Sequence, residues 1–167
     1  MGWALIFLFG GLAATLGDLN HVRWGVLAYP GGGQPLWVMG LMGSASVGMV
    51  AAHRGLPVRE APLAWGAVLP PATAFFAFYF LTGPLAPHPI ALTTILAVAF
   101  LARSRGEPAT VWLSPLGAAI GGPLFEAALS STGAFSYLCP RTFSVPTWLP
   151  FLYLHAGLAA RAIARAL

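Results

Sequence analysis

The first long apolar stretch of the chain, residues 3–24, reads WALIFLFGGLAATLGDLNHVRW. A helix needs ~20 mostly apolar residues to cross the hydrocarbon core of a bilayer. Its only formally charged side chains, Asp18 and Arg23, lie in its second half. No basic segment precedes the stretch and no convincing small-residue cleavage site follows it, which distinguishes it from a cleaved secretory signal. We therefore expect it to stay in the protein as a first transmembrane helix.

Further apolar stretches follow at regular intervals along the chain. Together with the first, they cover residues 3–24, 36–52, 61–81, 88–102, 109–129 and 147–164. The second and fourth are close to the lower limit of ~17 residues for a membrane span. Because the loops are short, consecutive helices are expected to be antiparallel neighbours. The sequence thus predicts an all-α, polytopic membrane protein, with residues 1–167 forming a single six-helix transmembrane domain.

The composition excludes several classes of protein. Hydrophobic residues make up 58% of the chain, charged residues only 7%, and the mean hydropathy is +0.80. Soluble domains carry about 25% charged residues, so this chain cannot cover a water-facing surface. The net charge of +4 does not indicate nucleic-acid binding, because no polar face gathers the basic residues. The single cysteine, Cys139, cannot form an internal disulfide, and no metal-ligand spacing accompanies it.

The basic residues indicate the topology. All eight are arginines, and six of them occupy alternate loops and the C-terminal end: Arg54, Arg59, Arg103, Arg105, Arg161 and Arg165. Cytoplasmic loops of membrane proteins carry an excess of basic residues, so both termini are predicted to be cytoplasmic. Arginine to the exclusion of lysine indicates a GC-rich bacterial genome, so the inner (plasma) membrane of a bacterial cell is the expected location, with a multi-pass topology.

Two of the predicted spans contain helix-breaking residues. Pro70 and Pro71 fall in the middle of the third span, and Gly121-Gly122-Pro123 falls late in the fifth. Proline removes a helix hydrogen bond and bends the axis, so we expect a kinked third span and a broken fifth span. These breaks fit either plain packing kinks or the walls of a cavity.

The second span carries small residues at every fourth position, namely Gly40, Ser44, Gly48 and Ala52. Such a ladder lets helix backbones approach closely. We expect it to pack inside the bundle, and a subunit interface is the alternative.

Ionisable groups within membrane spans are costly and therefore mark candidate functional sites. Asp18 and His21 are three residues apart and share one helix face with small residues. Arg23 lies on another face and is expected to extend towards the outer headgroups.

Glu126 lies on the fifth span and His155 on the sixth. Antiparallel packing places Asp18, His21 and Glu126 in the outer half of the bundle, where they would form a polar patch or pair separately with neighbours. For His155, a neutral ring bonded to a backbone carbonyl is favoured over a ligand contact. Arg141, in the last outer loop, is a candidate partner for Glu126.

Two other function classes could also use these polar groups. A small proton-coupled transporter could use Asp18, His21 and Glu126 as a relay, although no inverted repeat is visible in the sequence.

An intramembrane hydrolase would need a nucleophile beside a base. Ser130, Ser131 and Ser136 lie near the expected position of His21, but no catalytic motif accompanies them. The sequence therefore predicts a protein that is not an enzyme.

Short motifs along the chain carry a resemblance to a known family. In chain order they are GLAA at 11–14, VLAYP at 26–30, LWV at 36–38, RSRG at 103–106, TGAFSY at 132–137 and PTWLP at 146–150. Over nearly the whole chain, these motifs resemble those of the Insig proteins. Met39 replaces the proline that follows Trp-Val in Insig sequences, and Ala102 replaces an aspartate ahead of the Arg-Ser-Arg turn.

Insig proteins are six-helix membrane proteins with cytosolic termini, and in animals they bind oxysterols and retain sterol-sensing-domain proteins. The resemblance implies a bacterial member, actinobacterial or mycobacterial, that binds lipid without catalysis. The replaced aspartate supports partner binding in animal members, so Ala102 argues against a sterol-sensing-domain partner.

We therefore predict a lipid-sensing protein that holds a neutral lipid, diacylglycerol-like or sterol-like, in a cavity within the helix bundle. The predicted ligand-binding residues are Asp18, Asn20, His21, Trp37, Phe75, Phe78, Glu126, Trp148 and His155. No metal or cofactor other than bound lipid is expected, and no nucleic acid. A homo-oligomer, such as a trimer, is compatible with this prediction.

Overall fold

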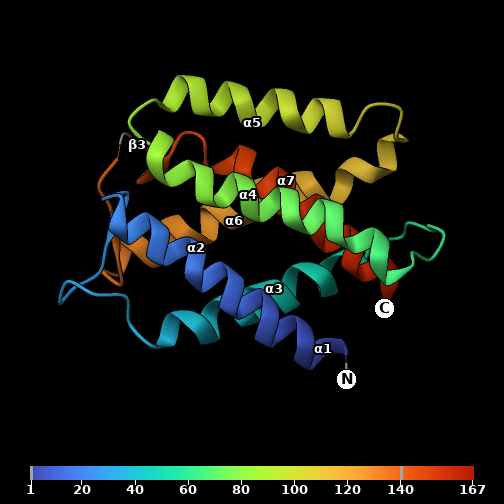
Figure 1. Cartoon of the computed structure of the whole chain (residues 1–167), viewed down its shortest axis with the longest axis horizontal. Helices are drawn as coiled ribbons and strands as arrows, with labels where there is room; N and C mark the ends of the chain where they lie inside the picture. Colours follow the sequence, from blue (N-terminus) through green and yellow to red (C-terminus); the bar gives the residue numbers. More distant parts are fainter. Residues whose placement is uncertain (1, 140) are drawn as a thin grey trace.

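The structure is a computed structural model that describes residues 2–139 and 141–167, with Arg141 described by its backbone alone. The described residues form six continuous helices, as the sequence predicts (Figure 1). The first joins α1 (Gly2–Leu5), η1 (Ile6–Gly10) and α2 (Gly11–Arg23). The others are α3 (Trp37–Arg54), η2 with α4 (Trp65–Val68, Leu69–Leu85), α5 (Pro89–Arg103), η3 with α6 (Ala109–Trp112, Leu113–Ser131) and α7 (Leu149–Ala166).

The outside of the bundle is apolar, as a membrane protein requires. Leu36, Ile90 and Phe9 are 98%, 84% and 67% exposed, and such surfaces on a water-soluble monomer would be unfavourable. The helices Gly2–Arg23 and Trp65–Leu85 are each long and apolar enough to cross a membrane, and Pro89–Arg103 is a shorter apolar helix. The chain begins and ends at the same end of the bundle, where Gly2 lies against Leu167 (Figure 1).

The prolines disturb the helices less than the sequence predicts. Pro70 and Pro71 lie in the first turn of α4 and not in the middle of a span. Backbone N–H groups in a first helical turn have no intrahelical acceptor, so proline costs little there. The predicted break in the fifth span is wrong, because α6 runs without interruption through Gly121, Gly122 and Pro123.

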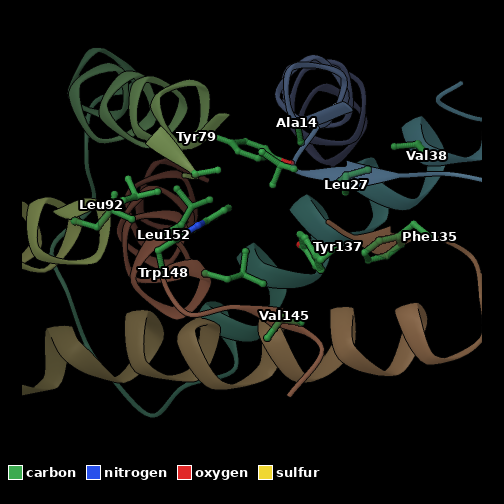
Figure 2. Close-up of a cluster of buried hydrophobic side chains, with 14 of the residues drawn as sticks. Ala14, Leu27, Val38, Tyr79, Leu92, Phe135, Tyr137, Val145, Trp148 and Leu152 are labelled. Carbon is green, nitrogen blue, oxygen red and sulfur yellow. The ribbon is translucent and has the colours of Figure 1, made fainter. Parts of the chain in front are cut away.

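Helix α7 is the centre of the bundle, in contact with α3, α4, α5 and α6. Its close contact with α6 depends on Gly157, because a Cβ at this position would lie 2.5 Å from the Cα of Pro115. Trp148, Leu149 and Leu152, at the start of α7, belong to the largest apolar cluster (Figure 2). The central position of α7 lets it present side chains to two opposite sides of the bundle.

The small-residue ladder on α3 does not pack inside the chain, contrary to the favoured prediction. A Cβ at Gly40 or Gly48 would meet no heavy atom within 4 Å. The close approach of α2 to α3 uses other glycines, because a Cβ on Gly11 would lie 3.0 Å from the Cα of Gly43. The helices adopt this register because it brings two residues without side chains face to face.

Short strands tie the loops together at the end of the bundle opposite the termini. Strand β1 (Leu27–Ala28) pairs antiparallel with β2 (Ser136–Tyr137), with Leu27 opposite Tyr137. Strands β3 (Arg141–Thr142) and β4 (Val145–Pro146) form a hairpin. Its two turn residues, Phe143 and Ser144, both have positive φ, as two-residue hairpin turns of this kind require. The β1–β2 pair joins the loop after α2 to the loop after α6.

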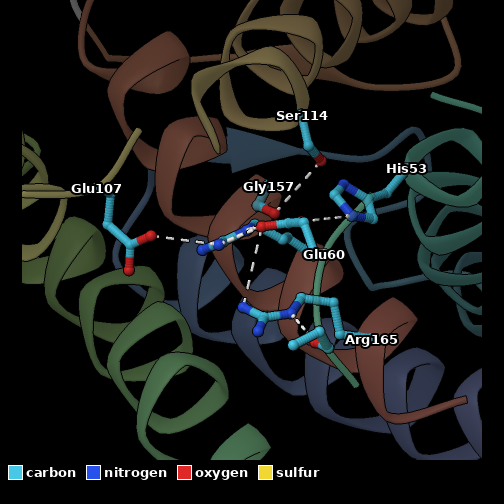
Figure 3. A network of polar contacts seen from close by, with 8 residues as sticks. His53, Glu60, Glu107, Ser114, Gly157 and Arg165 are labelled. Atoms are coloured by element: carbon cyan, nitrogen blue, oxygen red, sulfur yellow. Dashed lines mark hydrogen bonds and ion pairs between the residues drawn. The ribbon is translucent and has the colours of Figure 1, made fainter. Parts of the chain in front are cut away.

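At the opposite end, Glu60 joins the loop after α3 to α7 (Figure 3). Both of its oxygens accept from Nε of Arg161, at 2.8 and 3.1 Å, and Nη2 of Arg161 makes a further bond to it. His53 adds a contact of 3.3 Å between its Nε2 and Glu60. Nε of Arg165 donates to the carbonyl of Ala61 at 2.9 Å. Two of the arginines expected to act as topology markers thus also fasten this loop.

Candidate functional site

A cavity of about 640 Å³ opens between α2, α3, α4, α6 and α7. Most of the side chains that line it are apolar, and none of the described lining residues is an arginine or a lysine. It extends along α3 from Trp37 to His53, which at 1.5 Å per residue is about 24 Å. Five of the nine predicted ligand-binding residues line it: Asp18, His21, Trp37, Phe75 and Glu126.

Asp18, on α2, is 3% exposed and has two neutral donors. Its Oδ2 accepts from the hydroxyl of Tyr29 at 2.7 Å and from Nε2 of Gln34 at 2.6 Å. Gln34 also donates to the backbone carbonyl of Thr15 at 3.0 Å, which holds the loop against α2. Tyr29 directly follows β1, so the strand pair determines where its ring lies. The hydrogen bonds that Asp18 accepts at the cavity wall therefore depend on the loop after α2.

Glu126, on α6, is the second carboxyl group in the cavity wall. Its Oε1 accepts from the hydroxyl of Tyr153 on α7 at 2.6 Å, and its Oε2 accepts from the hydroxyl of Tyr137 in β2. The ring of Tyr153 fits against Gly122, where a Cβ would lie 2.2 Å from Cε1 of the ring. The β1–β2 pair thus connects the two carboxyl groups, because Tyr29, the donor to Asp18, directly follows β1, and Tyr137, the donor to Glu126, lies in β2.

His21, one helical turn from Asp18, is bonded to α4. Its Nε2 lies 2.6 Å from Oγ1 of Thr82, and the hydroxyl of Thr82 donates to the carbonyl of Tyr79 at 2.6 Å. Because the hydroxyl proton is used in that bond, Oγ1 can only accept from the ring, and Nε2 of His21 carries the proton. The chain of bonds ends at a backbone carbonyl, so His21 links α2 to α4 and does not extend towards either carboxyl.

The other four predicted site residues lie outside the cavity wall: Asn20, Phe78, Trp148 and His155. Asn20 turns to α4, where its side chain donates to the carbonyl of Phe80 at 3.0 Å. Phe78 packs on the ring of His155, with 4.4 Å between the ring centroids. Trp148 is fully buried, and its ring lies 5.6 Å from that of His21.

His155 shows the geometry that the sequence favoured for it. Its Nε2 lies 3.0 Å from the carbonyl of Leu96, so this nitrogen is the donor. Its Nδ1 accepts from Nη1 of Arg103 at 2.6 Å. His155 therefore joins α7 to α5 and is not in contact with the cavity.

Arg23 and Arg141 are the two arginines expected in the outer half of the bundle. Arg23 is exposed, and its position at the headgroups stays a prediction. The side chain of Arg141, the candidate partner for Glu126, lies outside the described residues. The described partners of Glu126 are the two tyrosines.

The cavity is open on the side between α3 and α6, which touch each other at few positions. Small residues line both edges of this opening, among them Ser44 and Gly48 on α3 and Gly117 and Gly121 on α6. All four are exposed in the isolated chain. The opening therefore lies along the side of the bundle, between the middle parts of α3 and α6.

Solved structures share the arrangement of the helices. The mycobacterial Insig homologue MvINS from Mycobacterium vanbaalenii matches with a TM-score of 0.87 and 24% sequence identity, over 98% of this chain and 92% of that chain. This chain has the Insig fold. A cross-linked MvINS trimer matches with a TM-score of 0.86, at the same identity and coverage. The resemblance to Insig proteins found in the sequence motifs is thereby confirmed as a likeness of fold.

No protein-family profile matches this Insig-fold chain, and no curated protein sequence matches it at a significant level. At 24% identity the structural likeness establishes the fold alone. What the cavity binds must therefore be argued from the residues that line it.

Sequence patterns did not single out Tyr29, Tyr137 or Tyr153 as residues of the Insig-fold cavity. The chain has four tyrosines, and all of them line the cavity: Tyr29, Tyr79, Tyr137 and Tyr153. A buried phenol needs a hydrogen-bond partner, so tyrosines among few polar residues were an available signal. Gln34 was missed as well, because its loop position gives no periodic pattern. Among the described residues, no protein group hydrogen-bonds the hydroxyl of Tyr79, which lines the cavity and can therefore meet a ligand.

Proposed function

We propose that this protein binds a neutral membrane lipid, diacylglycerol-like or sterol-like, in the cavity and takes part in lipid sensing or regulation without catalysis. The observation that carries the proposal is an apolar cavity whose polar lining includes carboxyls and phenols but no described arginine or lysine. Its volume, about 640 Å³, lies within the range of about 300–1,000 Å³ common for small-molecule pockets.

The charge of the lining favours a neutral ligand. A phosphate group inside the cavity would meet Asp18 and Glu126 without a compensating cation among the described lining residues. Hydroxyl and ester groups suit this site, because phenols and carboxyls can exchange hydrogen bonds with them. The apolar walls, including Phe75 and Phe76 on α4, suit acyl chains or a sterol ring system.

The lateral opening supports a ligand that arrives from the membrane. The small residues along α3 and α6 leave space between the helices without requiring the bundle to unfold. A lipid that diffuses in the bilayer would reach this opening directly, whereas a water-soluble ligand would not.

No observation favours the alternative functions. Asp18, His21 and Glu126 each have separate partners, and among the described residues no hydrogen bond joins any two of the three. The hydroxyls of Ser130 and Ser131 donate to the carbonyls of Phe135 and Ala128. These bonds support a binding role over a proton relay or a serine nucleophile.

The test is mass spectrometry of lipid extracted from the detergent-purified protein. We expect a neutral lipid enriched well above its share of the membrane. Gly48→Leu places a side chain in the cavity, whereas Gly40→Leu places one on the same helix away from it, and neither position has a neighbour within 4 Å. The neutral lipid is expected to fall in Gly48→Leu and to persist in Gly40→Leu. Recovery of bulk phospholipid alone, in bulk proportions, would reject the proposal.

We propose further that copies of this chain associate in a bacterial plasma membrane, with the arginine-rich end cytoplasmic. The support is the cross-linked trimer of MvINS and the exposed face of α3 at Gly40, which contacts nothing within the chain. Cysteine cross-linking at position 40 in membranes, read out by gel mobility, tests the association. Because the one introduced cysteine per chain forms a single disulfide, a disulfide-linked dimer would support the association, and a three-copy band with a trifunctional maleimide would support a trimer.

A further inference from the structure

A second pocket, of about 250 Å³, lies at the end of the bundle where the chain terminates. Three arginines from two helices line it: Arg103 at the end of α5, and Arg161 and Arg165 on α7. No residue lines both this pocket and the lipid cavity, because α7 presents opposite faces to the two. The pocket is therefore a separate candidate site.

The positive charge of this pocket is only partly neutralised. Of the described carboxylates, Glu60 and Glu107 lie within ion-pair distance of the arginine side chains, and both contact Arg161. Arg165 approaches Glu60 only to 4.0 Å. Arg103 forms no ion pair with a described carboxylate, and its described partner is the neutral acceptor Nδ1 of His155. Three guanidiniums thus face two carboxylates, and the pocket keeps a positive charge.

The arginines are held in position before any ligand binds. The side chains of Arg161 and Arg165 are only 11% and 19% exposed. Arg165 is fixed twice, by its bond to the carbonyl of Ala61 and by the 2.9 Å bond from the backbone N–H of Leu63 to its own carbonyl. Preorganised guanidinium forks lose little entropy on binding an oxyanion and match phosphate geometry.

The side chains that line the pocket and its position at the helix ends indicate which class of ligand it would bind. The pocket combines the arginines and one carboxylate, Glu107, with apolar side chains such as Leu63, and it lies where the apolar helices end. Lipid phosphates occupy this level of a bilayer, and basic pockets between transmembrane helices bind lipid headgroups. We propose that this pocket binds a phosphate group, with the headgroup phosphate of an anionic membrane lipid as its source.

The experiment compares full-length protein in phosphatidylcholine nanodiscs that contain or lack phosphatidylglycerol, with retained lipid counted by native mass spectrometry. A second arm titrates inorganic phosphate into the detergent-purified protein and follows its Tm. We expect phosphatidylglycerol to be retained in preference to phosphatidylcholine. Inorganic phosphate that raises Tm without any phosphatidylglycerol preference would assign the same phosphate site to a soluble ligand.

The variants are Arg103→Gln and Arg165→Gln, with Arg105→Gln as the matched control. Arg105 lies two residues from Arg103 at the same end of the bundle, is exposed and does not line the pocket. Loss of one charge-assisted contact is expected to weaken phosphatidylglycerol retention about tenfold in each pocket variant and to leave the control unchanged. If Arg103→Gln fails to fold because it loses His155, Arg165→Gln still provides the test.

Two results would overturn the proposal. One is equal retention of phosphatidylglycerol and phosphatidylcholine together with no effect of inorganic phosphate on Tm. The other is an equal loss in Arg105→Gln, which would indicate general surface charge. Gly48→Leu is expected to leave phosphatidylglycerol retention intact, so failure of the cavity proposal and failure of this one can be told apart.

Discussion

The hydroxyl of Tyr153 on α7 donates a 2.6 Å hydrogen bond to Oε1 of Glu126 on α6, at the wall of the larger cavity. The bond joins the central helix to a neighbour and gives a half-buried carboxyl one of its two described donors. It is possible because Gly122 leaves room for the tyrosine ring. The polar lining and the helix packing therefore depend on the same contact.

Removal of this hydroxyl is expected to destabilise the protein. Tyr153→Phe leaves Oε1 of Glu126 without its donor, and we expect a loss of about 1 kcal/mol, since hydrogen bonds within membrane bundles are worth about that much. Tyr79→Phe is the control, because no described protein group bonds its hydroxyl. Thermal unfolding in detergent measures both. An equal fall in Tm in the two variants would contradict the assigned role of Tyr153.

The glycine pair on α6 allows a matched test of the space that Tyr153 needs. A methyl group at position 122 would lie 2.2–2.5 Å from the tyrosine ring, whereas one at 121 would meet nothing within 4 Å. We expect Gly122→Ala to cost about 1–3 kcal/mol through overpacking and to lower lipid retention by moving Tyr153. Gly121→Ala is expected to be neutral or slightly stabilising, because alanine favours the helix. Tm and lipid content are the two measurements, and a neutral Gly122→Ala would count against the packing described.

Because His21 donates to the hydroxyl of Thr82, we expect removal of this hydroxyl to destabilise the protein. Thr82→Val keeps the shape of the side chain but leaves Nε2–H of His21 buried without its acceptor, which we expect to cost about 1–3 kcal/mol. Thr94→Val is the control, since the hydroxyl of Thr94 is exposed on α5 and bonds only its own helix. The difference between the two Tm values measures the effect. Equal values would indicate that His21 finds another acceptor.

Glu60 predicts a loss of stability in acid. Its hydrogen bonds from Arg161 lower the pKa of this carboxyl below its ordinary value of 4.5, against the opposing effect of burial. The folded protein therefore holds the charged form more strongly, and the stabilisation is present above pH 4.5 and disappears as the pH falls through the lower, folded-state pKa. The groups that face Glu60 are His53 on α3 and Arg161 and Arg165 on α7.

The measurement is Tm as a function of pH between 7 and about 3, with Glu60→Gln and Glu107→Gln as variants. We expect Glu60→Gln to lower Tm at neutral pH and to remove part of the fall in acid. Glu107 is 41% exposed and makes a single 3.3 Å contact, so its variant is expected to follow the parent profile. A parent profile that Glu60→Gln leaves unchanged would argue that other groups cause the acid loss.

Local patterns of the chain were sufficient to predict the class of the fold. Hydropathy located all six helices within a few residues, and the resemblance of short motifs to Insig proteins agrees with the structural comparison. The third span is the main displacement, from the predicted 61–81 to 65–85. Within it, the proline pair lies in the first turn of α4, where the sequence suggested a kink. Hydropathy and proline rules are properties of neighbouring residues, and this explains both the success and the displacement.

Part of the candidate site could also be predicted from the sequence. Asp18, His21 and Glu126 were singled out because ionisable groups inside spans are rare, and all three line the cavity. His155 was singled out by the same rule, yet it bonds a neighbouring helix. Asn20, predicted as a polar contact to the ligand, also bonds a neighbouring helix. The rule identifies costly groups, but it does not distinguish a group that faces a cavity from one bonded within the bundle.

The sequence by itself determined the number of helices, the arginine-rich end and the presence of buried polar groups, because hydrophobicity and charge act along a single span. Only the tertiary structure decided which of these groups meet. The β1–β2 pair places Tyr29 and Tyr137 at the cavity from loops more than 100 residues apart in the chain. Helix packing brings Arg103 and Arg161 into one pocket from α5 and α7. Such contacts depend on the rotation and register of whole helices, which glycine contacts such as Gly11 with Gly43 determine across the bundle.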